Sequence, residues 1–326
     1  MLMRQRQLRL VSKSLLLVHG ASAKQFLQGL TTKDMDSLNN VPLVYSFLLN
    51  VRGRILADFF IYRGNNGGNA ETFVLETEKS QAELLEKTLK LYRLRKQIGI
   101  EPLLGKTVLF RFDAEGETTQ KQKATIPENS SDWMADPRVP GFGFRAIRKI
   151  EKETAHDDEA SSSAYLRHRL AWGLAEGTEM VDQIPLNMNG DITGGISFEK
   201  GCYIGQELVA RTHFTGIVRR RLMPFRPIDD KNGRDGFRDG FLLDERGKRQ
   251  GKIICSHGQL GGLCLASLDI VPPADCPSAD QSTTPLSDQS AVYPHSDLSF
   301  SPSVRLFDSS GAAVIVHRPK WWPSVS

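Results

Sequence analysis

The chain contains the stretch Lys200-Gly201-Cys202-Tyr203-Ile204-Gly205-Gln206-Glu207. Gly201 and Gly205 permit sharp turns and close approach of the backbone. Residues 206–210 suit a helix, so we expect Cys202 to lie just ahead of a helix N-terminus. The backbone amides at such a place, together with the ammonium of Lys200, would favour the thiolate, which is the form that binds metal or attacks an electrophile. The alternative is a small, buried and inert side chain, which is the commoner fate of a cysteine.

Length, composition and charge limit the classes of protein to which the chain can belong. The chain has 326 residues, of which 40% are hydrophobic and 25% charged, as in ordinary soluble globular proteins. This length suggests about two domains. No apolar run is long enough to span a bilayer, so we expect no membrane contact. A net charge of +4 is too weakly basic to demand nucleic acid. RNA binding through the basic segments is the weakest hypothesis, because they lack interleaved aromatic residues.

The four cysteines, at positions 202, 255, 264 and 276, form no Cys-x-x-Cys pair. Their spacing argues against a disulfide framework and a closed structural metal site, and it favours a reducing compartment. We interpret Cys255 and Cys264 as structural residues of strands, and Cys276 as incidental. The segment before Asp34 is basic and free of acids, as in a mitochondrial transit peptide.

The hydrophobic pattern predicts strands at residues 8–18, 44–49 and 55–62, the last two forming a hairpin with Gly53 at its turn. Residues 79–91 have the apolar stripe of a helix. Beyond a linker at 224–240, short strands separated by glycines predict a small barrel or sandwich. We expect two domains, 1–225 and 226–326. Polar stretches near 114–132 and 151–163 are expected to be surface insertions, and 272–297 a disordered insertion in the second domain.

The octapeptide and its continuation through Leu208-Val209-Ala210-Arg211-Thr212 resemble the signature of the YgfZ-type proteins. Stretches at 20–32, 48–58, 169–177 and 184–186 also resemble this family, in the same order. These proteins are relatives of the glycine-cleavage T-protein, a folate-dependent aminomethyltransferase. Within the family, the chain most resembles the mitochondrial iron-sulfur cluster assembly factors. The resemblance implies an α+β fold: a T-protein-like body of two lobes around a central cavity, plus a C-terminal antiparallel β-barrel.

Two acidic groups of the T-protein pattern are missing here. T-proteins carry paired aspartates after the hairpin, where this chain has Ala57 and Asp58. They also carry a glutamate that accepts hydrogen bonds from the pterin, where this chain has Ala171, which cannot accept one. We therefore do not expect aminomethyl transfer, although tetrahydrofolate remains a candidate occupant of the cavity. Asp58 is either the catalytic acid of a transferase or, as we favour, a structural carboxylate.

The resemblance implies a factor that is not an enzyme and acts with an A-type iron-sulfur carrier protein in the mitochondrial matrix. Together they would help convert [2Fe-2S] units into [4Fe-4S] clusters for recipient enzymes. An iron-sulfur cluster usually needs four thiolates, so Cys202 would share a cluster with the partner's thiolates. His213 is a weaker candidate for a second ligand. The motif residues carried over from the family are Lys200, Gly201, Cys202, Tyr203, Gly205, Gln206, Glu207 and Arg211.

Within that hypothesis, Lys200 and Arg211 would supply positive potential, and Gln206 and Glu207 would orient the loop and cap the following helix. The competing hypothesis is a tetrahydrofolate-dependent one-carbon transferase with Asp58 as its acid. The two hypotheses differ in the residue on which function depends, Cys202 in the first and Asp58 in the second.

Overall fold

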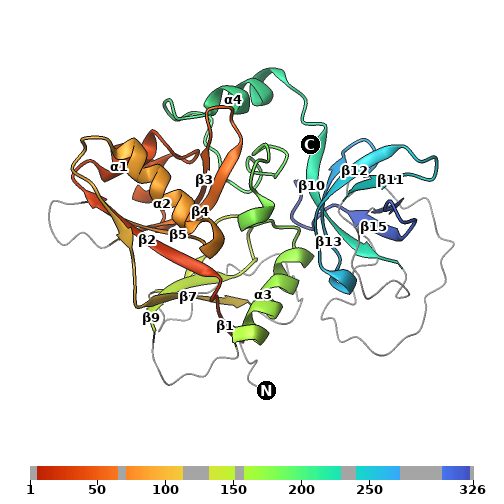
Figure 1. The fold of residues 1–326 in the computed structure, drawn as a ribbon, viewed down its shortest axis with the longest axis horizontal. Helices are drawn as coiled ribbons and strands as arrows, with labels where there is room; N and C mark the ends of the chain where they lie inside the picture. The colour runs from red at the N-terminus through yellow and green to blue at the C-terminus, as the bar shows by residue number, and fades with distance from the viewer. Residues whose placement is uncertain are drawn as a thin grey trace.

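Three sheets organise the part of the chain that the structure describes (Figure 1). The computed structural model describes residues 6–64, 71–112, 132–150, 158–228, 240–271 and 303–323. A five-stranded sheet, in the order β3-β4-β5-β2-β6, contains β2 Lys13–Gly20, β3 Leu43–Leu49, β4 Ile55–Arg63, β5 Glu71–Glu78 and β6 Gly99–Pro102. A four-stranded sheet, in the order β1-β7-β9-β8, contains β1 Arg6–Arg9, β7 Lys106–Phe112, β8 Met134–Ala135 and β9 Phe144–Lys149.

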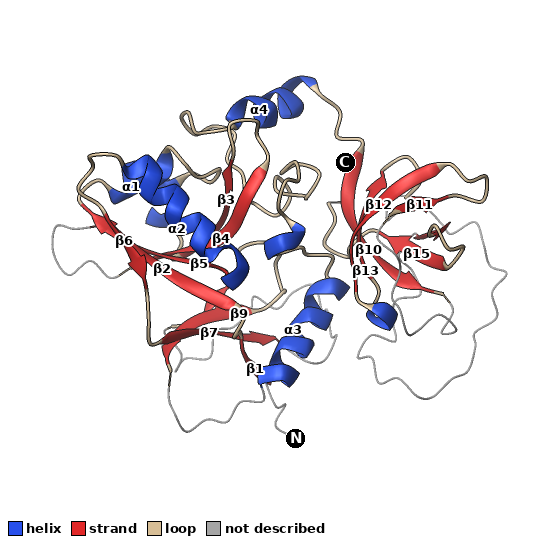
Figure 2. Cartoon of the chain, viewed as in Figure 1, coloured by secondary structure: helices blue, strands red, loops and turns tan. Residues whose placement is uncertain are grey.

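The third sheet is a closed barrel in the order β10-β13-β12-β11-β14-β15, and all its strand pairs are antiparallel. Its strands are β10 Arg220–Pro227, β11 Phe241–Leu243, β12 Arg249–Ser256, β13 Gly262–Ser267, β14 Ser303–Phe307 and β15 Ala313–His317. The α-helices of the described residues all lie in the body: α1 Ala23–Gln28, α2 Lys79–Arg93, α3 Asp158–Ala171 and α4 Gln206–Thr215. Figure 2 shows this division between a mixed body and a barrel of strands, which is the α+β architecture expected from the sequence.

The five-stranded sheet is buried on both faces, and β3 has no exposed residue. Successive side chains of a strand point to opposite faces, so an uninterrupted apolar strand must be covered on both. Val44 and Leu48 pack with α1 and α2, whereas Tyr45 and Phe47 pack towards the centre of the molecule. The hairpin of β3 and β4 was predicted with nearly these bounds, as was α2.

The N-terminal strand prediction was wrong in one respect. Residues 8–18 are not one strand, because β1 pairs with β7 in one sheet and β2 pairs with β5 and β6 in the other. A turn at Val11 and Ser12 carries the chain between the two sheets. An apolar run shows that residues are buried but not which sheet buries them, so this break has no signal in the pattern.

The insertions expected near 114–132, 151–163 and 272–297 lie largely outside the described residues. The structure does not describe 113–131, 151–157 or 272–302. The insertion expected at 151–163 is too long, because α3 begins at Asp158. The linker expected at 224–240 begins too early, because β10 continues to Pro227. The domain division at 225/226 stays a proposal, and β10 crosses it.

One outer face of the barrel packs against the body. Leu222, Leu263 and Leu265 share a hydrophobic cluster with Tyr45 and Phe47 of β3. Near the C-terminus, the indole Nε1 of Trp321 donates a hydrogen bond to the carbonyl of Trp172 at 2.7 Å. The barrel is thus attached to the end of α3 as well as to the sheet.

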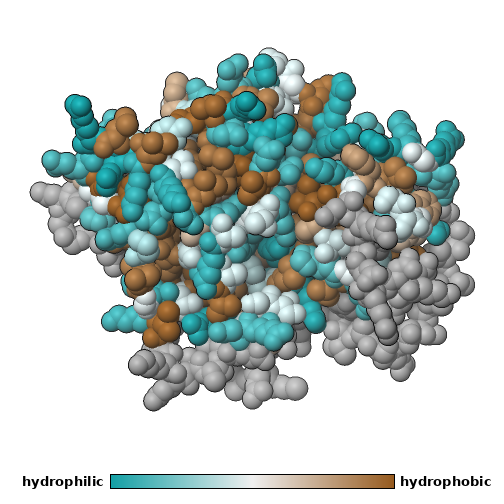
Figure 3. Space-filling view, viewed as in Figure 1, coloured by the Kyte–Doolittle hydropathy of each residue, from teal (hydrophilic) through white to brown (hydrophobic). Residues whose placement is uncertain are grey.

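Hydrophobic and hydrophilic residues are interspersed over the face shown in Figure 3. Among the described residues, no helix has both the length and the apolar character needed to cross a membrane.

Candidate functional site

The octapeptide forms a loop that leads into α4, which lies across the tip of the β3-β4 hairpin (Figure 1). Helix α4 begins at Gln206, so Cys202 lies just ahead of it, as expected. Gly205 is the N-cap residue and has φ of +78°. A Cβ at this position would lie 2.4 Å from the carbonyl oxygen of Asn50, so a side chain would collide with the hairpin. Gly205 is therefore required both by its backbone conformation and by the close approach of the hairpin.

Lys200 fastens the start of the loop to the segment after α1. Its ammonium donates hydrogen bonds to the backbone carbonyls of Gln28 at 2.8 Å, Thr31 at 2.6 Å and Lys33 at 3.1 Å. Burial lowers the pKa of Lys200 to about 8, so the ammonium form still predominates at neutral pH. All three of its hydrogens are used in these bonds. Lys200 therefore acts as a loop anchor, and its effect on the charge of Cys202 stays a prediction.

Two further contacts hold the middle of the loop. The Oε1 of Gln206 accepts a hydrogen bond from the backbone N–H of Tyr203 at 3.2 Å, and the N–H of Ile204 donates to the carbonyl of Gly29 at 3.2 Å. The Tyr203 ring lies 5.0 Å from the Lys200 ammonium, and burial raises the pKa of its hydroxyl to about 12. Gln206 thus orients the loop, whereas Glu207 is an exposed acid in the first turn of α4.

Cys202 itself is exposed and forms no disulfide. Among the residues that the structure describes, the one group of three or more metal-binding side chains is Glu179, Cys255 and His257, which does not include it. His213, the weaker candidate ligand, is exposed and stacks on Phe198 with ring centroids 3.5 Å apart. Cys202 is thus presented to solvent on a well-anchored loop.

The surface of α4 near its C-terminal end carries exposed side chains of two kinds. Arg211 is exposed and cationic, while Phe214 and Ile217 are large hydrophobic residues with 69% and 80% of their surface exposed. Val51, at the tip of the neighbouring hairpin, is 78% exposed. Exposed apolar residues beside a charged one are typical of a surface that meets another protein.

Asp58 lies inside the body, away from solvent. Its carboxylate accepts hydrogen bonds from the hydroxyl of Tyr45 at 2.9 Å and from the N–H of Gly177 at 2.8 Å. Burial raises its pKa to about 6, against the opposing effect of the nearby Lys13 ammonium. These contacts are those of a structural carboxylate that joins β4 to the segment after α3.

Asp58 borders a network of buried charges that sequence reasoning missed. Arg145 is fully buried, and its guanidinium bonds to Glu76 at 2.5 Å and Asp136 at 2.7 Å. Arg138 bonds in turn to Asp136 and to Glu176. Arginine and carboxylate residues are ordinarily surface residues, so nothing in their sequence pattern distinguished the buried ones.

The centre of the molecule, where both lobes and the barrel meet, is nearly filled. The cavity there has a volume of about 10 Å³ and is lined by side chains that include Tyr45, Arg138, Asn189 and Leu222. The buried Oδ1 of Asn189 has no hydrogen-bond partner among the described residues, so a single water molecule suits this space. A pteridine ring is many times larger. The residues present therefore do not fit tetrahydrofolate in this conformation.

A larger hollow of about 220 Å³ lies between the start of α2 and one side of α3. Its walls include the carboxylates of Glu78, Glu176 and Glu179. The guanidinium of Arg169 also lines the hollow and pairs with Glu179, so its walls carry charges of both signs.

Comparison with solved structures supports the fold that the sequence resemblance implied. The crystal structure of glycine cleavage system aminomethyltransferase T from Bartonella henselae superposes with a TM-score of 0.62 and covers 96% of this chain and 84% of that chain. Only 16% of the aligned residues are identical, so this likeness shows the fold alone. No family model matches the sequence.

Curated relatives give the family. The iron-sulfur cluster assembly factor IBA57 homolog, mitochondrial, of Pyricularia oryzae is 31% identical, covering 80% of this chain and 72% of that protein. The human mitochondrial factor IBA57 is 28% identical over 98% of this chain and 85% of its own length. The Coccidioides immitis homologue is 33% identical, but the match covers only 55% of that protein. The chain belongs to the IBA57 family of mitochondrial proteins, which confirms the family and the location that the sequence resemblance implied.

Proposed function

We propose that this protein is an iron-sulfur cluster assembly factor in which Cys202 ligates a cluster shared with an A-type iron-sulfur carrier protein. The observation that carries this proposal is the exposed Cys202 thiol on a loop that is anchored at both ends. The names of its relatives, which are iron-sulfur cluster assembly factors, support the same general function. Recipient [4Fe-4S] enzymes would be served indirectly, through the shared cluster.

The coordination chemistry of the cluster explains why a partner is required. Clusters of this kind are usually held by four cysteine thiolates. Among the described residues, Cys202 has no neighbouring cysteine to complete such a set. A carrier protein that brings the remaining thiolates would complete it, and this protein could then release the cluster by losing its single ligand, Cys202.

The anchored loop lowers the cost of forming this shared site. A ligand that is already held in its binding position loses little conformational entropy when it binds. Lys200 fixes one end of the loop, and Gly205 fixes the other against the hairpin. The exposed Arg211 and Phe214 on α4, and Ile217 just after it, are candidates for contact with the carrier protein.

The test is anaerobic mixing of the protein with the cluster-loaded A-type carrier, followed by visible absorption and gel filtration. We expect a coloured complex with the wild-type protein and its loss with Cys202→Ser, which keeps the size of the side chain but removes the soft ligand. Cys255→Ser, which removes a less exposed thiol, is the matched control and should retain the colour. A wild-type mixture without a coloured complex, or equal colour with Cys202→Ser, would overturn the proposal.

The one-carbon transferase remains the competing hypothesis, and one experiment in cells can test both hypotheses. Asp58 is buried and bound to Tyr45 and Gly177, and the central cavity has no room for a pterin, so the geometry disfavours the transferase. In cells depleted of the native protein, we expect Asp58→Asn to support maturation of [4Fe-4S] enzymes and Cys202→Ala to fail. The opposite pattern would favour the transferase.

A further inference from the structure

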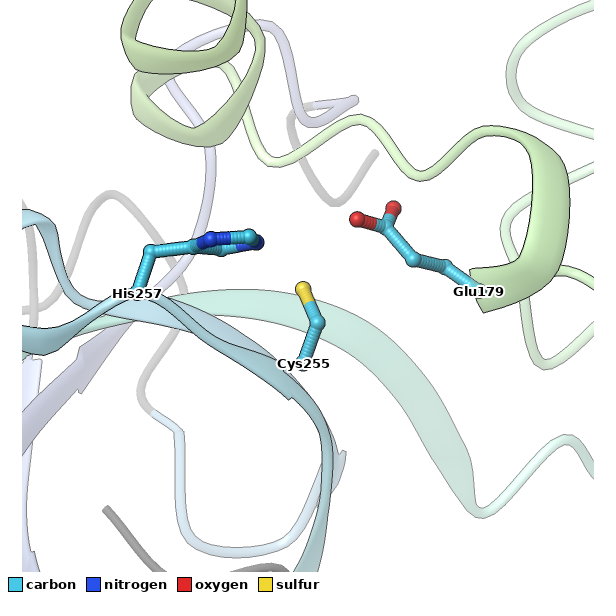
Figure 4. A group of neighbouring side chains, drawn as sticks. All are labelled: Glu179, Cys255 and His257. Carbon is cyan, nitrogen blue, oxygen red and sulfur yellow. The ribbon is translucent and has the colours of Figure 1, made fainter. Parts of the chain in front are cut away.

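Three metal-binding side chains converge at the junction of the body and the barrel. Glu179 comes from the 3-10 helix Gly177–Glu179 of the body, Cys255 from the end of β12 in the barrel, and His257 from the residue just after β12. Their ligand atoms all lie within 4.8 Å of one another. Figure 4 shows the carboxylate, the thiol and the imidazole directed towards a common space. Sequence spacing could not reveal this group, because Glu179 is remote from the other two residues in the chain.

A β-bulge turns Cys255 towards this space. Ile253 pairs with Cys264, but Cys255 pairs with Leu263, so one extra residue, Ile254, is inserted at this point in β12. In a regular strand Cys255 would point to the same side as Ile253, which is buried in the barrel core. The bulge instead places Cys255 against the hydrophobic cluster shared with the body. Bulges commonly redirect a side chain next to a functional site.

Arg169 holds the carboxylate of Glu179 in place. Its guanidinium donates one hydrogen bond to each carboxylate oxygen, at 2.5 and 2.8 Å, and Nη1 also bonds to the carbonyl of Leu174. Oε2 also accepts a hydrogen bond from the backbone N–H of Glu176 at 3.0 Å, so the lone pair that Glu179 can offer to a cation is on Oε1. Ligands of bound metal ions are usually oriented by such outer hydrogen bonds. Arg169 would also offset part of the negative charge of the ligand set.

We propose that Glu179, Cys255 and His257 bind a divalent transition-metal ion of the Zn²⁺ class at this junction. A thiolate, an imidazole and a carboxylate together suit Zn²⁺, Co²⁺ or Fe²⁺ better than Mg²⁺ or Ca²⁺, which prefer oxygen ligands alone. Bond lengths of about 2.0–2.3 Å place the ligands of a tetrahedral ion about 3.5 Å apart. Side-chain rotations that close the group by roughly 1 Å would therefore complete the site. Three protein ligands leave the fourth position for water.

Binding requires one proton to leave the Cys255 thiol for solvent, while His257 binds through a neutral nitrogen and Glu179 as its carboxylate. Because the ligands come from both parts of the chain, a bound ion would fasten the barrel to the body. It would therefore stabilise the folded protein by mass action, since the unfolded chain does not hold the three ligands together. This site is separate from Cys202 and does not depend on the function proposed for it.

The test uses Co²⁺ as a coloured probe, added without oxygen to metal-free full-length protein carrying Cys202→Ser. This background removes Cys202, the one fully exposed thiol among the described residues. We expect one Co²⁺ per chain, with a sulfur-to-cobalt charge-transfer band and the strong visible absorption of a tetrahedral site. Cys255→Ser should abolish the charge-transfer band, and His257→Gln should weaken binding at least about tenfold. Zn²⁺ should displace Co²⁺ and raise the thermal unfolding midpoint of the Cys202→Ser protein.

The controls separate loss of a ligand from loss of the fold. Serine is close in size to cysteine, and His257 is exposed, so both variants should unfold at the same temperature as their parent when metal is absent. The buried Cys264 provides a further control, since Cys264→Ala in the same background should keep the charge-transfer band. A parent protein that gives no charge-transfer band, or a band that survives Cys255→Ser, would overturn the proposal.

Discussion

The two glycines of the octapeptide differ in what the surrounding structure demands of them. Gly205 has a positive φ and lies against the backbone of Asn50, whereas a Cβ at Gly201 would meet no atom within 4 Å. The sequence suggested a turn at both positions, because glycine permits one. It could not show that only Gly205 lies against another segment. A glycine is required where a side chain has no room, and that depends on contacts remote in the chain.

This difference predicts opposite results for two alanine substitutions. Gly205→Ala should destabilise the protein by about 2 kcal/mol or more, because it adds the strain of a left-handed residue and pushes on the hairpin. A Cβ at Gly201 would meet no other atom within 4 Å. The unfolding free energy of Gly201→Ala should therefore stay within about 0.5 kcal/mol of wild type. Urea denaturation measures both. Equal effects of the two substitutions would mean that the hairpin does not fix this end of the loop.

At the scale of elements, the sequence predicted what local patterns determine. The β3-β4 hairpin and α2 each carry their own period or turn residues and lie near the predicted bounds, and short strands form the barrel as expected. The break between β1 and β2 could not be predicted, because it depends on pairing with distant strands. The group of Glu179, Cys255 and His257 was not predicted either, because contacts between distant segments bring it together. The bulge that turns Cys255 towards this group also has no sequence signal. The candidate site at Cys202 was found because its residues are contiguous.

The start of the barrel offers an element-scale test. The side chain of Asn189 donates a hydrogen bond to the carbonyl of Leu222 in β10 at 2.9 Å, and Asn189 has φ of +63°. Asn189→Ala should cost about 2–3 kcal/mol, because it leaves a buried carbonyl unpaired and strains the backbone. Asn189→Gly removes the same hydrogen bond without the backbone strain and should cost less.

Thermal unfolding gives the order of stability, which should be wild type, then Asn189→Gly, then Asn189→Ala. Hydrogen exchange of the β10 amides shows whether the loss is local to the joint between body and barrel. Equal stability of all three proteins would indicate that the packing of Leu222 alone holds β10 to the body.

At the scale of the whole molecule, buried charge replaces open space at the centre of the fold. The network includes the cations Lys13, Arg138 and Arg145 and the carboxylates Asp58, Glu76, Asp136 and Glu176, all of them buried. Ion pairs to the cations hold the pKa of Glu176 and of Asp136 below the usual range. Asp58 forms no ion pair with the described residues and accepts hydrogen bonds from Tyr45 and Gly177. Burial therefore outweighs the attraction of the Lys13 ammonium and raises the pKa of Asp58. Removing one member of such a network leaves other buried charges unpaired, which is strongly destabilising. The network therefore keeps the centre of the molecule rigid.

The raised pKa of Asp58 predicts how stability changes with pH. Its pKa is about 6 in the folded protein and 3.8 in the unfolded chain, so the folded state binds more protons between these values. Stability from this group is therefore fully present below about pH 4 and is lost as pH rises through 6. The loss amounts to roughly 2–3 kcal/mol. The side chain introduced by Asp58→Asn cannot ionise, so the unfolding free energy of this variant should lack this decline. Urea denaturation of both proteins between about pH 4 and pH 7 isolates Asp58, because the difference removes the groups they share. A difference that does not change with pH would show that Asp58 is already ionised throughout this range.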